Sequence, residues 1–307
     1  MNIPTLDLDL FIKGNVIEKK QFSHDIGEAF HNIGFVSIKN HGIDDQLVQS
    51  LYESIQRFFS LPLELKQSYE INGLAGQRGY TSFGKEHAKG SVSPDLKEFF
   101  QYGQPLDEHL PNVLVNEISD LNTTLDKAFI EFEKSGLFLL RAIAIYLGLD
   151  EYYFDKKVIK GESILRAIHY PPITQNPQSA VRAEQHEDIN LITLLIGASA
   201  DGLQILSKEN KWLNINADPG HIVVNVGDML QRLTNNKLKS TTHRVINPPE
   251  QFWHTSRFSI PFFLHPHSSV SLSCLESCIT ADTPRMFNDI TAGEYLHERL
   301  IEIGLKN

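Results

Sequence analysis

The sequence is poor in several features that would point to other classes of protein. It has only two cysteines, Cys274 and Cys278, too few for a disulfide framework or a four-ligand zinc site, so we expect free thiols in a reducing cytoplasm. No apolar run approaches the roughly 20 residues of a membrane-spanning helix, and the N-terminus lacks the basic-then-apolar pattern of a signal peptide. We find no internal repeat and no low-complexity segment.

Positive charge is also scarce. Lys and Arg number 28 against 38 Asp and Glu, and the formal net charge of −10 argues against a nucleic-acid partner and against an anionic membrane surface. The 307 residues are 41% hydrophobic and 21% charged, which is typical of a soluble globular protein. We expect a monomer with one domain over 1–307 that acts on a small molecule, because β-sandwiches and barrels of this size often form one domain.

The first half of the chain combines strands with amphipathic helices. Alternating apolar residues predict a strand over 3–10, and a second strand is expected at 34–40, followed by a turn in which His41 makes structural hydrogen bonds. Helices are expected over 18–32, from 44 or 45 until Pro62, and over 119–146. The apolar stripe of the last helix must lie on a sheet.

The stretch 73–103 has a different character. Its glycines and its length favour an irregular segment over a helix, and long irregular segments in compact domains are often functional. We interpret it as a loop over a pocket, with Gln77, Arg78 and Tyr80 as candidate substrate contacts and Arg78 against a polar or anionic group. The alternative is a surface loop without a functional role.

The second half changes to short apolar runs separated by turn signals such as Pro171-Pro172 and Asp218-Pro219-Gly220. Strands are expected at 164–170, 189–196, 203–206, 212–215, 222–226, 241–246 and 256–264. Many short strands with regular turns are typical of a sandwich or barrel. The predicted fold class is mainly β with flanking helices, closed by a C-terminal helix in which Thr291 and Glu294 have capping-box spacing.

A histidine and an aspartate precede one of these apolar runs. His186 and Asp188 are two residues apart, so in an extended segment both side chains point to the same face. Such a triplet alone is common and usually means a solvated turn. His243 follows several predicted strands later, and a sheet rolled on itself can bring it to the same place. Two imidazoles and one carboxylate are the donor set of non-haem iron(II) sites, which leaves positions open for an anionic chelator and oxygen.

A second polar pair, Arg257 and Ser259, lies on the last predicted strand. By the same alternation both face one way, opposite to Phe258 and Ile260. A guanidinium inside an apolar layer needs an anion, and a hydroxyl beside it would complete a clamp for a carboxylate. An internal Asp or Glu partner is the more frequent fate of a buried arginine, but the closeness to His243 in the chain favours a bound ligand.

Taken together and in order, short motifs across nearly the whole chain resemble the iron(II)/2-oxoglutarate oxygenase superfamily, and within it the isopenicillin N synthase-like branch. The motifs are Asn40-His41-Gly42-Ile43, Tyr170-Pro171-Pro172, His186-Glu187-Asp188, Asn225-Val226-Gly227-Asp228, Thr234-Asn235-Asn236, His243-Arg244-Val245 and Arg257-Phe258-Ser259. The resemblance implies a double-stranded β-helix (jelly-roll) core over 160–285, and an N-terminal module over 1–115 in the same oxygenase domain.

The resemblance also implies a role for individual residues. Iron(II) would be bound by His186, Asp188 and His243. The distal carboxylate of 2-oxoglutarate, the co-substrate used together with O2, would be held by Arg257, Ser259 and Tyr170. The expected activity is that of an iron(II)- and 2-oxoglutarate-dependent dioxygenase that hydroxylates or desaturates a small-molecule metabolite.

Two alternatives stay open at this point. The run from His186 to Thr193 is closest to isopenicillin N synthase, which uses no 2-oxoglutarate. An iron oxidase that binds its substrate directly to the metal would use Arg257 for a carboxylate of that substrate. The other alternative is a β-sandwich binding module without catalysis, whose histidines are core or zinc residues.

Overall fold

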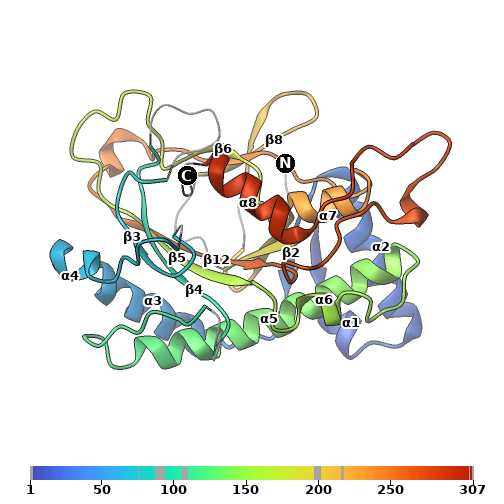
Figure 1. Cartoon of the computed structure of the whole chain (residues 1–307), viewed down its shortest axis with the longest axis horizontal. Helices are drawn as coiled ribbons and strands as arrows, with labels where there is room; N and C mark the ends of the chain where they lie inside the picture. Colours follow the sequence, from blue (N-terminus) through green and yellow to red (C-terminus); the bar gives the residue numbers. More distant parts are fainter. Residues whose placement is uncertain are drawn as a thin grey trace.

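The computed structural model describes residues 3–74, 76–86, 94–105, 110–196, 202–215, 218–303 and 305, and Figure 1 shows the chain. The strands are β1 (Thr5–Asp7), β2 (Phe35–Lys39), β3 (Gly79–Thr81), β4 (Glu98–Tyr102), β5 (Ile164–Tyr170), β6 (Ala183–His186), β7 (Ile192–Ile196), β8 (Leu203–Leu206), β9 (Trp212–Asn214), β10 (Ile222–Val226), β11 (His243–Val245) and β12 (Arg257–Leu264). The α-helices are α1 (Asp9–Ile12), α2 (Val16–Asn32), α3 (Asp45–Phe59), α4 (Leu63–Gln67), α5 (Leu121–Tyr146), α6 (Asp155–Val158), α7 (Asp228–Leu233) and α8 (Ala292–Glu302).

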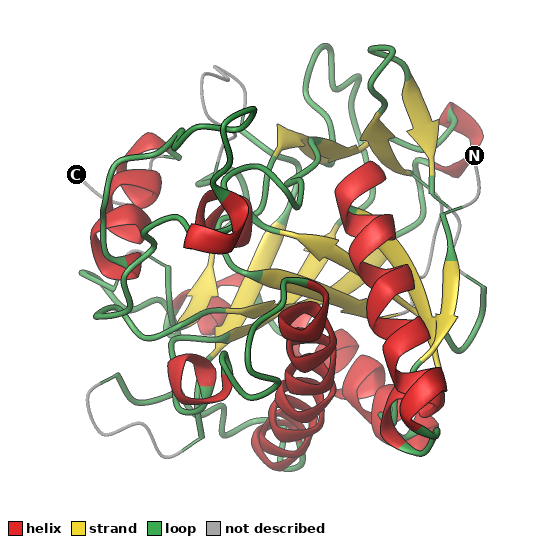
Figure 2. Cartoon of the chain, turned by 90° about the vertical axis from the view of Figure 1, so that its right-hand side faces the viewer, coloured by secondary structure: helices red, strands yellow, loops and turns green. Residues whose placement is uncertain are grey.

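The strands form two sheets, drawn in yellow in Figure 2. The larger sheet has the order β1-β2-β10-β7-β12-β5-β4-β3, and the smaller has the order β6-β11-β8-β9. The pairs at the centre of the larger sheet are antiparallel, whereas β1 and β2 run parallel at its edge. Side chains of both sheets line one cavity, so the strands form the jelly roll that the sequence predicts.

The long helix α5 covers the outer face of the larger sheet. In Figure 1 it runs below the strands of the larger sheet, while α8 lies above β12. The ring of Phe262 on β12 lies 5.0 Å from that of Phe129 and 5.5 Å from that of Phe132, measured between centroids. Gly136 allows this close packing, because a Cβ there would stand 2.8 Å from Leu264 Cδ2. The predicted apolar stripe of this helix therefore packs on the sheet.

Alternation along β12 sorts its residues between core and cavity. Phe262 and Leu264 belong to the apolar core under α5, whereas Arg257, Ser259 and Phe263 line the cavity. Successive side chains of a strand point to opposite faces, so one strand serves both surfaces. This period of two brings a guanidinium and a hydroxyl into the interior of a largely apolar domain.

The N-terminal segments extend the larger sheet and pack on α5. Val36 of β2 lies opposite Val224 of β10, so the first third of the chain is joined to the strands of the second half. Asn15 makes a capping box at the start of α2, Asp44 caps α3, and Thr291 makes the predicted capping box at α8. Within the described ranges, no helix has both the length and the apolar character needed to cross a membrane.

Several local predictions are confirmed. His41 is a structural residue: its Nε2 lies 3.1 Å from the Gly220 carbonyl oxygen, and its Nδ1 accepts the Ile43 N–H at 3.2 Å. Cys274 and Cys278 are buried free thiols. The strands expected at 164–170, 203–206 and 222–226 have those bounds in the structure.

Other predictions are corrected. The strand expected over 3–10 covers only Thr5–Asp7, because α1 begins directly after it. The strand expected over 189–196 begins at Ile192, because the chain first has to cross from β6 of the smaller sheet to β7 of the larger sheet. The stretch 73–103 is not one irregular loop, since β3 and β4 pair at the edge of the larger sheet. The sequence analysis missed β6 and α7.

Candidate active site

A cavity of about 580 Å³ lies between the two sheets. Its walls are the inner faces of β5, β7 and β12 from the larger sheet and of β6, β8 and β11 from the smaller. The C-terminal helix α8 covers one side through Leu296, Arg299 and Leu300. Three regions of this cavity carry polar side chains.

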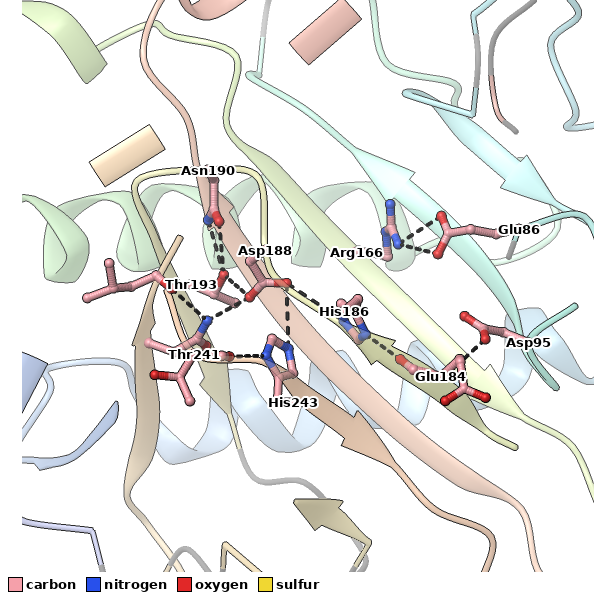
Figure 3. A network of polar contacts seen from close by, with 12 residues as sticks. Glu86, Asp95, Arg166, Glu184, His186, Asp188, Asn190, Thr193, Thr241 and His243 are labelled. Carbon is pink, nitrogen blue, oxygen red and sulfur yellow. Dashed lines mark hydrogen bonds and ion pairs between the residues drawn. The ribbon is translucent and has the colours of Figure 1, made fainter. Parts of the chain in front are cut away.

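The first region contains the two histidines and the aspartate. His186 ends β6, Asp188 follows it in the loop before β7, and His243 begins β11. In the pairing of β6 with β11, His243 lies directly opposite His186. Asp188 Oδ1 lies 3.9 Å from His186 Nε2 and 3.7 Å from His243 Nε2. One ligand atom from each residue falls within 4.8 Å of the other two, and Figure 3 shows Asp188 next to both imidazoles.

Backbone carbonyls fix the orientation of both imidazoles. His186 Nδ1 lies 2.7 Å from the Glu184 carbonyl oxygen, and His243 Nδ1 lies 3.1 Å from that of Thr241 (Figure 3). A carbonyl oxygen only accepts, so each Nδ1 is the protonated nitrogen and each Nε2 keeps its lone pair. Both lone pairs are therefore available on the side of Asp188 Oδ1, as a metal ligand requires.

The carboxylate of Asp188 is held through its other oxygen. Oδ2 accepts hydrogen bonds from Thr193 Oγ1 at 2.6 Å and from Asn225 Nδ2 at 2.8 Å, which leaves Oδ1 directed at the imidazoles. Asn190 in turn donates to Thr193 Oγ1 at 3.1 Å. The sequence analysis gave Thr193 and Asn225 no role. Each is a polar residue within an otherwise apolar strand, and that pattern could have indicated a hydrogen-bonding role in the interior.

The electrostatics of this region suit a cation. Burial, together with the neighbouring His243, lowers the pKa of His186 to about 4, so its imidazole is neutral at physiological pH. Burial alone would raise the pKa of Asp188, but the two facing imidazoles and its two hydrogen bonds lower it, so it stays ionised. A neutral imidazole, a second imidazole and a carboxylate on one side of a cavity fit a divalent transition metal such as iron(II).

The second region is the corner around Arg257. Arg257 is 1% exposed, and its guanidinium carbon lies 5.0 Å from the centroid of the Tyr170 ring, the residue opposite it in the pairing of β12 with β5. Ser259 lies opposite Ile168 in the same pairing. Arg257, Ser259 and Tyr170 all line the cavity. A guanidinium and two hydroxyls in one corner are donors for a carboxylate.

A second buried arginine lies behind this corner. The guanidinium carbon of Arg182 lies 5.9 Å from the centroid of Tyr170, and its Nη2 donates to the Thr255 carbonyl at 3.0 Å. Burial, together with the charge of Arg257, lowers the pKa of Arg182 to about 10, so the guanidinium of Arg182 remains charged at physiological pH. The two cations raise the positive potential of this corner, which favours an anion there.

The third region is a network of buried charges. Lys97 Nζ lies 2.6 Å from Glu86 Oε1 and 2.8 Å from Asp95 Oδ2, and Arg166 Nη1 lies 3.2 Å from Glu86 (Figure 3 shows the latter pair). Burial opposes the charge on Glu86, but Arg166 and Lys97 lower its pKa to about 2. The sequence analysis missed this network; alternation on β5 would have placed Arg166 on the same face as Tyr170.

The predicted substrate contacts are placed differently from one another. Gln77 lines the cavity. Arg78 is 2% exposed and donates to the carbonyls of Gln77 and Leu110 at 2.8 Å and 3.2 Å, so its guanidinium binds the backbone of two segments. The Tyr80 hydroxyl donates to Glu98 and its ring packs in the apolar core. Arg78 and Tyr80 do not line the cavity, which corrects the expectation that they face it.

The Thr234-Asn235-Asn236 motif has a structural role. Asn235 adopts a φ of 48° directly after α7, and its side-chain amide donates to the carbonyls of Cys278, Thr283 and Pro284 at 3.3, 3.2 and 3.1 Å. Its Oδ1 accepts the Met286 N–H at 2.9 Å. The motif thus fixes the segment that leads to α8 and does not contribute to the cavity wall.

Comparison with known proteins identifies relatives along the whole chain. The profile for the non-haem dioxygenase in morphine synthesis N-terminal family matches residues 3–124, and that for the 2OG-Fe(II) oxygenase superfamily matches residues 161–266. The chain is 30% identical to the proline hydroxylase buaE of Petromyces alliaceus, over 98% of this chain and 99% of that protein.

Solved structures agree with these matches. A putative 2OG-Fe(II) oxygenase family protein from Caulobacter crescentus is 38% identical, with a TM-score of 0.88 over 98% of this chain and 99% of that chain. A full-length Neurospora crassa protein, crystallised in complex with alpha-KG, is 31% identical, with a TM-score of 0.88 over 97% of this chain and 95% of that chain.

Proposed function

Because the chain belongs to the 2OG-Fe(II) oxygenase superfamily, we propose that His186, Asp188 and His243 bind its iron(II) and that Arg257, Ser259 and Tyr170 hold the distal carboxylate of 2-oxoglutarate. The protein is an iron(II)- and 2-oxoglutarate-dependent dioxygenase, an oxidoreductase that hydroxylates or desaturates a small-molecule metabolite. When bound, iron(II) and 2-oxoglutarate supply the oxidising chemistry, in which decarboxylation of the co-substrate to succinate drives oxidation of a substrate C–H bond by O2.

One observation carries the assignment of residues. His186 Nε2, His243 Nε2 and Asp188 Oδ1 converge in the same cavity that contains Arg257 and Ser259. The two histidines are oriented by backbone carbonyls and the aspartate by Thr193 and Asn225, so the donor atoms are preorganised by the chain itself.

The other residues of the cavity have supporting roles. Arg257 and Ser259 orient the co-substrate by its far carboxylate, and Arg182 adds positive potential behind them. Apolar side chains such as Leu203 and Leu296 line the cavity and limit the water inside it. Because Arg257 is 1% exposed, its interaction with a bound anion is stronger than it would be in water.

The experiment that tests this assignment is anaerobic calorimetry of 2-oxoglutarate into iron(II)-loaded protein. We expect binding to wild-type protein and a ten- to hundredfold weaker affinity in Arg257→Ala, since a hydrogen bond to a charged group contributes about 1.5–3 kcal/mol. Arg244→Ala is the matched control, because Arg244 is bonded to Gln204 and stacked on Trp212, outside the cavity wall. No binding of 2-oxoglutarate to wild-type protein would favour an oxidase that holds a substrate carboxylate with Arg257.

Finer features of the protein are part of the same proposal. We propose one oxygenase domain over 1–307, with an N-terminal module over 1–115 and a catalytic core over 160–285. We further propose that the enzyme is a cytoplasmic monomer without a nucleic-acid partner, supported by the net charge of −10 and the two free thiols. Light scattering of the purified full chain tests the monomeric state.

A further inference from the structure

His265 is a buried imidazole for which the mechanism described so far has no use. It follows the last residue of β12 and continues the inward alternation of Arg257, Ser259 and Phe263, so its side chain lines the cavity. The residue is 7% exposed. Ser163 fixes its backbone, because Ser163 Oγ accepts the His265 N–H at 3.1 Å and donates to the His265 carbonyl at 3.4 Å.

The imidazole of His265 is placed without a partner from the protein. In the part of the chain that the structure describes, neither ring nitrogen makes a hydrogen bond or an ion pair. Burial lowers its pKa to about 4, so the ring is neutral at physiological pH and offers one N–H donor and one nitrogen acceptor. Because His265 lines the cavity, its ring nitrogens are available for hydrogen bonds to a molecule bound there.

Arg166 also has an unpaired donor on the same cavity wall. Its Nε donates to Gln101 Oε1 at 2.7 Å and its Nη1 lies 3.2 Å from Glu86, whereas Nη2 has no hydrogen-bond partner among the described residues. The guanidinium is held flat by two rings, with its carbon 4.3 Å from the centroid of Phe99 and 5.2 Å from that of Phe263. Its remaining N–H groups are therefore fixed in position.

The charges near His265 and Arg166 are already balanced. Two cations, Lys97 and Arg166, contact two anions, Glu86 and Asp95. An added carboxylate would have no uncompensated cation to bind, and an added ammonium group would meet Arg166 without a free anion. The rest of this wall carries the neutral amides of Gln77 and Gln101 and the ion pair between Arg299 and Glu302. Its apolar side chains are those of Ile164, Phe263, Leu296, Leu300, Ile303 and Leu305. This combination selects for an uncharged molecule that carries a polar group on an apolar body.

We propose that His265 and Arg166 form a substrate subsite that binds an uncharged small molecule through an amide-type group, either a carboxamide or a lactam. The carbonyl oxygen accepts from Arg166 Nη2, and the imidazole of His265, further along the same wall, exchanges a hydrogen bond with the same molecule. His265 is then a positioning residue that orients the substrate relative to the metal. This inference rests on the proposed function, because it places the substrate in the cavity that holds iron(II) and 2-oxoglutarate.

The test uses full-length protein loaded with Mn(II) and saturated with 2-oxoglutarate. Benzamide, 2-piperidone, benzoate and benzylamine are the probes, and their paramagnetic relaxation by Mn(II) reports both affinity and closeness to the metal. We expect the two amides to bind near the metal and at least tenfold more tightly than benzoate or benzylamine. Failure of both amides to bind, or tighter binding of benzoate, overturns the proposal.

Three variants connect this selectivity to His265. His265→Phe keeps an aromatic ring but removes both hydrogen-bonding nitrogens, and it should weaken amide binding roughly tenfold. His265→Asn restores a donor and an acceptor and should recover most of the affinity. His267→Phe is the matched control, because His267 lies two residues further on and bonds to the Ile159 carbonyl, outside the cavity wall. Equal amide affinity in wild type and His265→Phe overturns the proposal.

A second measurement separates this inference from the proposed function. Calorimetry of 2-oxoglutarate into metal-loaded His265→Phe should give the wild-type affinity, because the co-substrate is held by Arg257. If 2-oxoglutarate binds and the amide preference is absent, only the subsite is wrong. If wild-type protein binds Mn(II) but not 2-oxoglutarate, the proposed function itself fails.

Discussion

The metal end and the substrate end of the cavity differ in how their polar atoms are satisfied. At the metal end, backbone carbonyls occupy the Nδ1 of His186 and of His243, and two side chains occupy one oxygen of Asp188. At the substrate end, the imidazole of His265 and Nη2 of Arg166 have no partner among the described residues. The chain thus completes the first site itself and leaves the second to be completed by a ligand.

This difference explains how one fold serves many substrates. The residues of the metal end are held in place by the protein whichever substrate is bound, so the same residues can support oxidation of different molecules. The substrate end recognises its ligand by the hydrogen bonds that the protein leaves open. Changes at the metal end should therefore abolish function broadly, and changes at the substrate end should alter selectivity.

The largest effect is expected from breaking the metal end. Asp188→Ala removes the carboxylate of the donor set and should lower iron(II) affinity by roughly a hundredfold or more, since even supporting residues around a metal contribute 10–100-fold. Anaerobic titration of iron(II) measures the affinity. Asp228→Asn is the control, because Asp228 lines the same cavity but bonds to Tyr295. Iron binding by Asp188→Ala as tight as in wild type would refute the assignment.

The next effect concerns the co-substrate corner. Arg257→Lys keeps a positive charge but loses the planar fork that binds a carboxylate through two hydrogen bonds, so 2-oxoglutarate affinity should fall roughly tenfold. Iron(II) affinity should stay unchanged, because Arg257 is not among the residues that gather around Asp188. Calorimetry with each ligand separates the two. Equal 2-oxoglutarate affinity in wild type and Arg257→Lys would show that charge alone is recognised.

A supporting residue of the metal end should have a smaller effect. Asn225→Ala removes one of the two hydrogen bonds to Asp188 Oδ2 and allows the carboxylate to rotate. We expect an affinity for iron(II) about tenfold lower than in wild type. Asn214→Ala is the matched control, because Asn214 bonds to Gln204 on the exposed side of the smaller sheet. An unchanged affinity in Asn225→Ala would mean that Thr193 alone orients Asp188.

A pH experiment sharpens the view of the substrate end. His265 has a pKa of about 4 in the folded protein against 6.5 when unfolded, so the unfolded state binds more protons between these values. The free energy of unfolding therefore falls as the pH falls, and His265 should contribute about 1 kcal/mol to that loss between pH 7 and 5.5. Urea unfolding of metal-free wild type, His265→Phe and His267→Phe measures it. We expect a shallower dependence only in His265→Phe; identical slopes would contradict a buried neutral His265.

The sequence analysis located features that depend on local pattern. Alternation predicted β5 and β10 with the bounds they have, and the spacing of His186 and Asp188 placed both side chains on one face. It missed β6 because Glu184 and Gln185 interrupt any apolar pattern there. Membership of His243 in the same site depended on a family resemblance, since no local rule predicts which strands a rolled sheet brings together.

The buried charge network shows a second limit of sequence. Glu86, Lys97 and Arg166 belong to three separate segments, and a charged residue in a glycine-rich stretch is normally assigned to the surface. Arg166 on β5 lies opposite Gln101 of β4, and no spacing in the chain reveals this pairing. Interactions between distant segments determine which residues line this part of the cavity, whereas local periodicity was enough to predict where the strands lie.

The smallest effect on ligand binding is expected from a change at Arg78. This prediction distinguishes residues that line the cavity from residues of the neighbouring segment. The positive, glycine-rich sequence around Arg78 predicted a substrate contact, but the guanidinium lies over Gly103, where a Cβ would stand 2.0 Å from its carbon. Arg78 donates hydrogen bonds to the backbone carbonyls of Gln77 and Leu110. Its side chain therefore joins the backbone at Gln77 to that at Leu110.

Arg78→Ala should accordingly lower the free energy of unfolding by roughly 1–3 kcal/mol, because it leaves buried carbonyls without their donors. The affinities for 2-oxoglutarate and for the amide probes should remain those of wild type. Urea unfolding together with probe titration measures both quantities, and Lys85→Ala, which removes an exposed cation bonded to Glu70, is the control. Weaker probe binding at unchanged stability would return Arg78 to the substrate site.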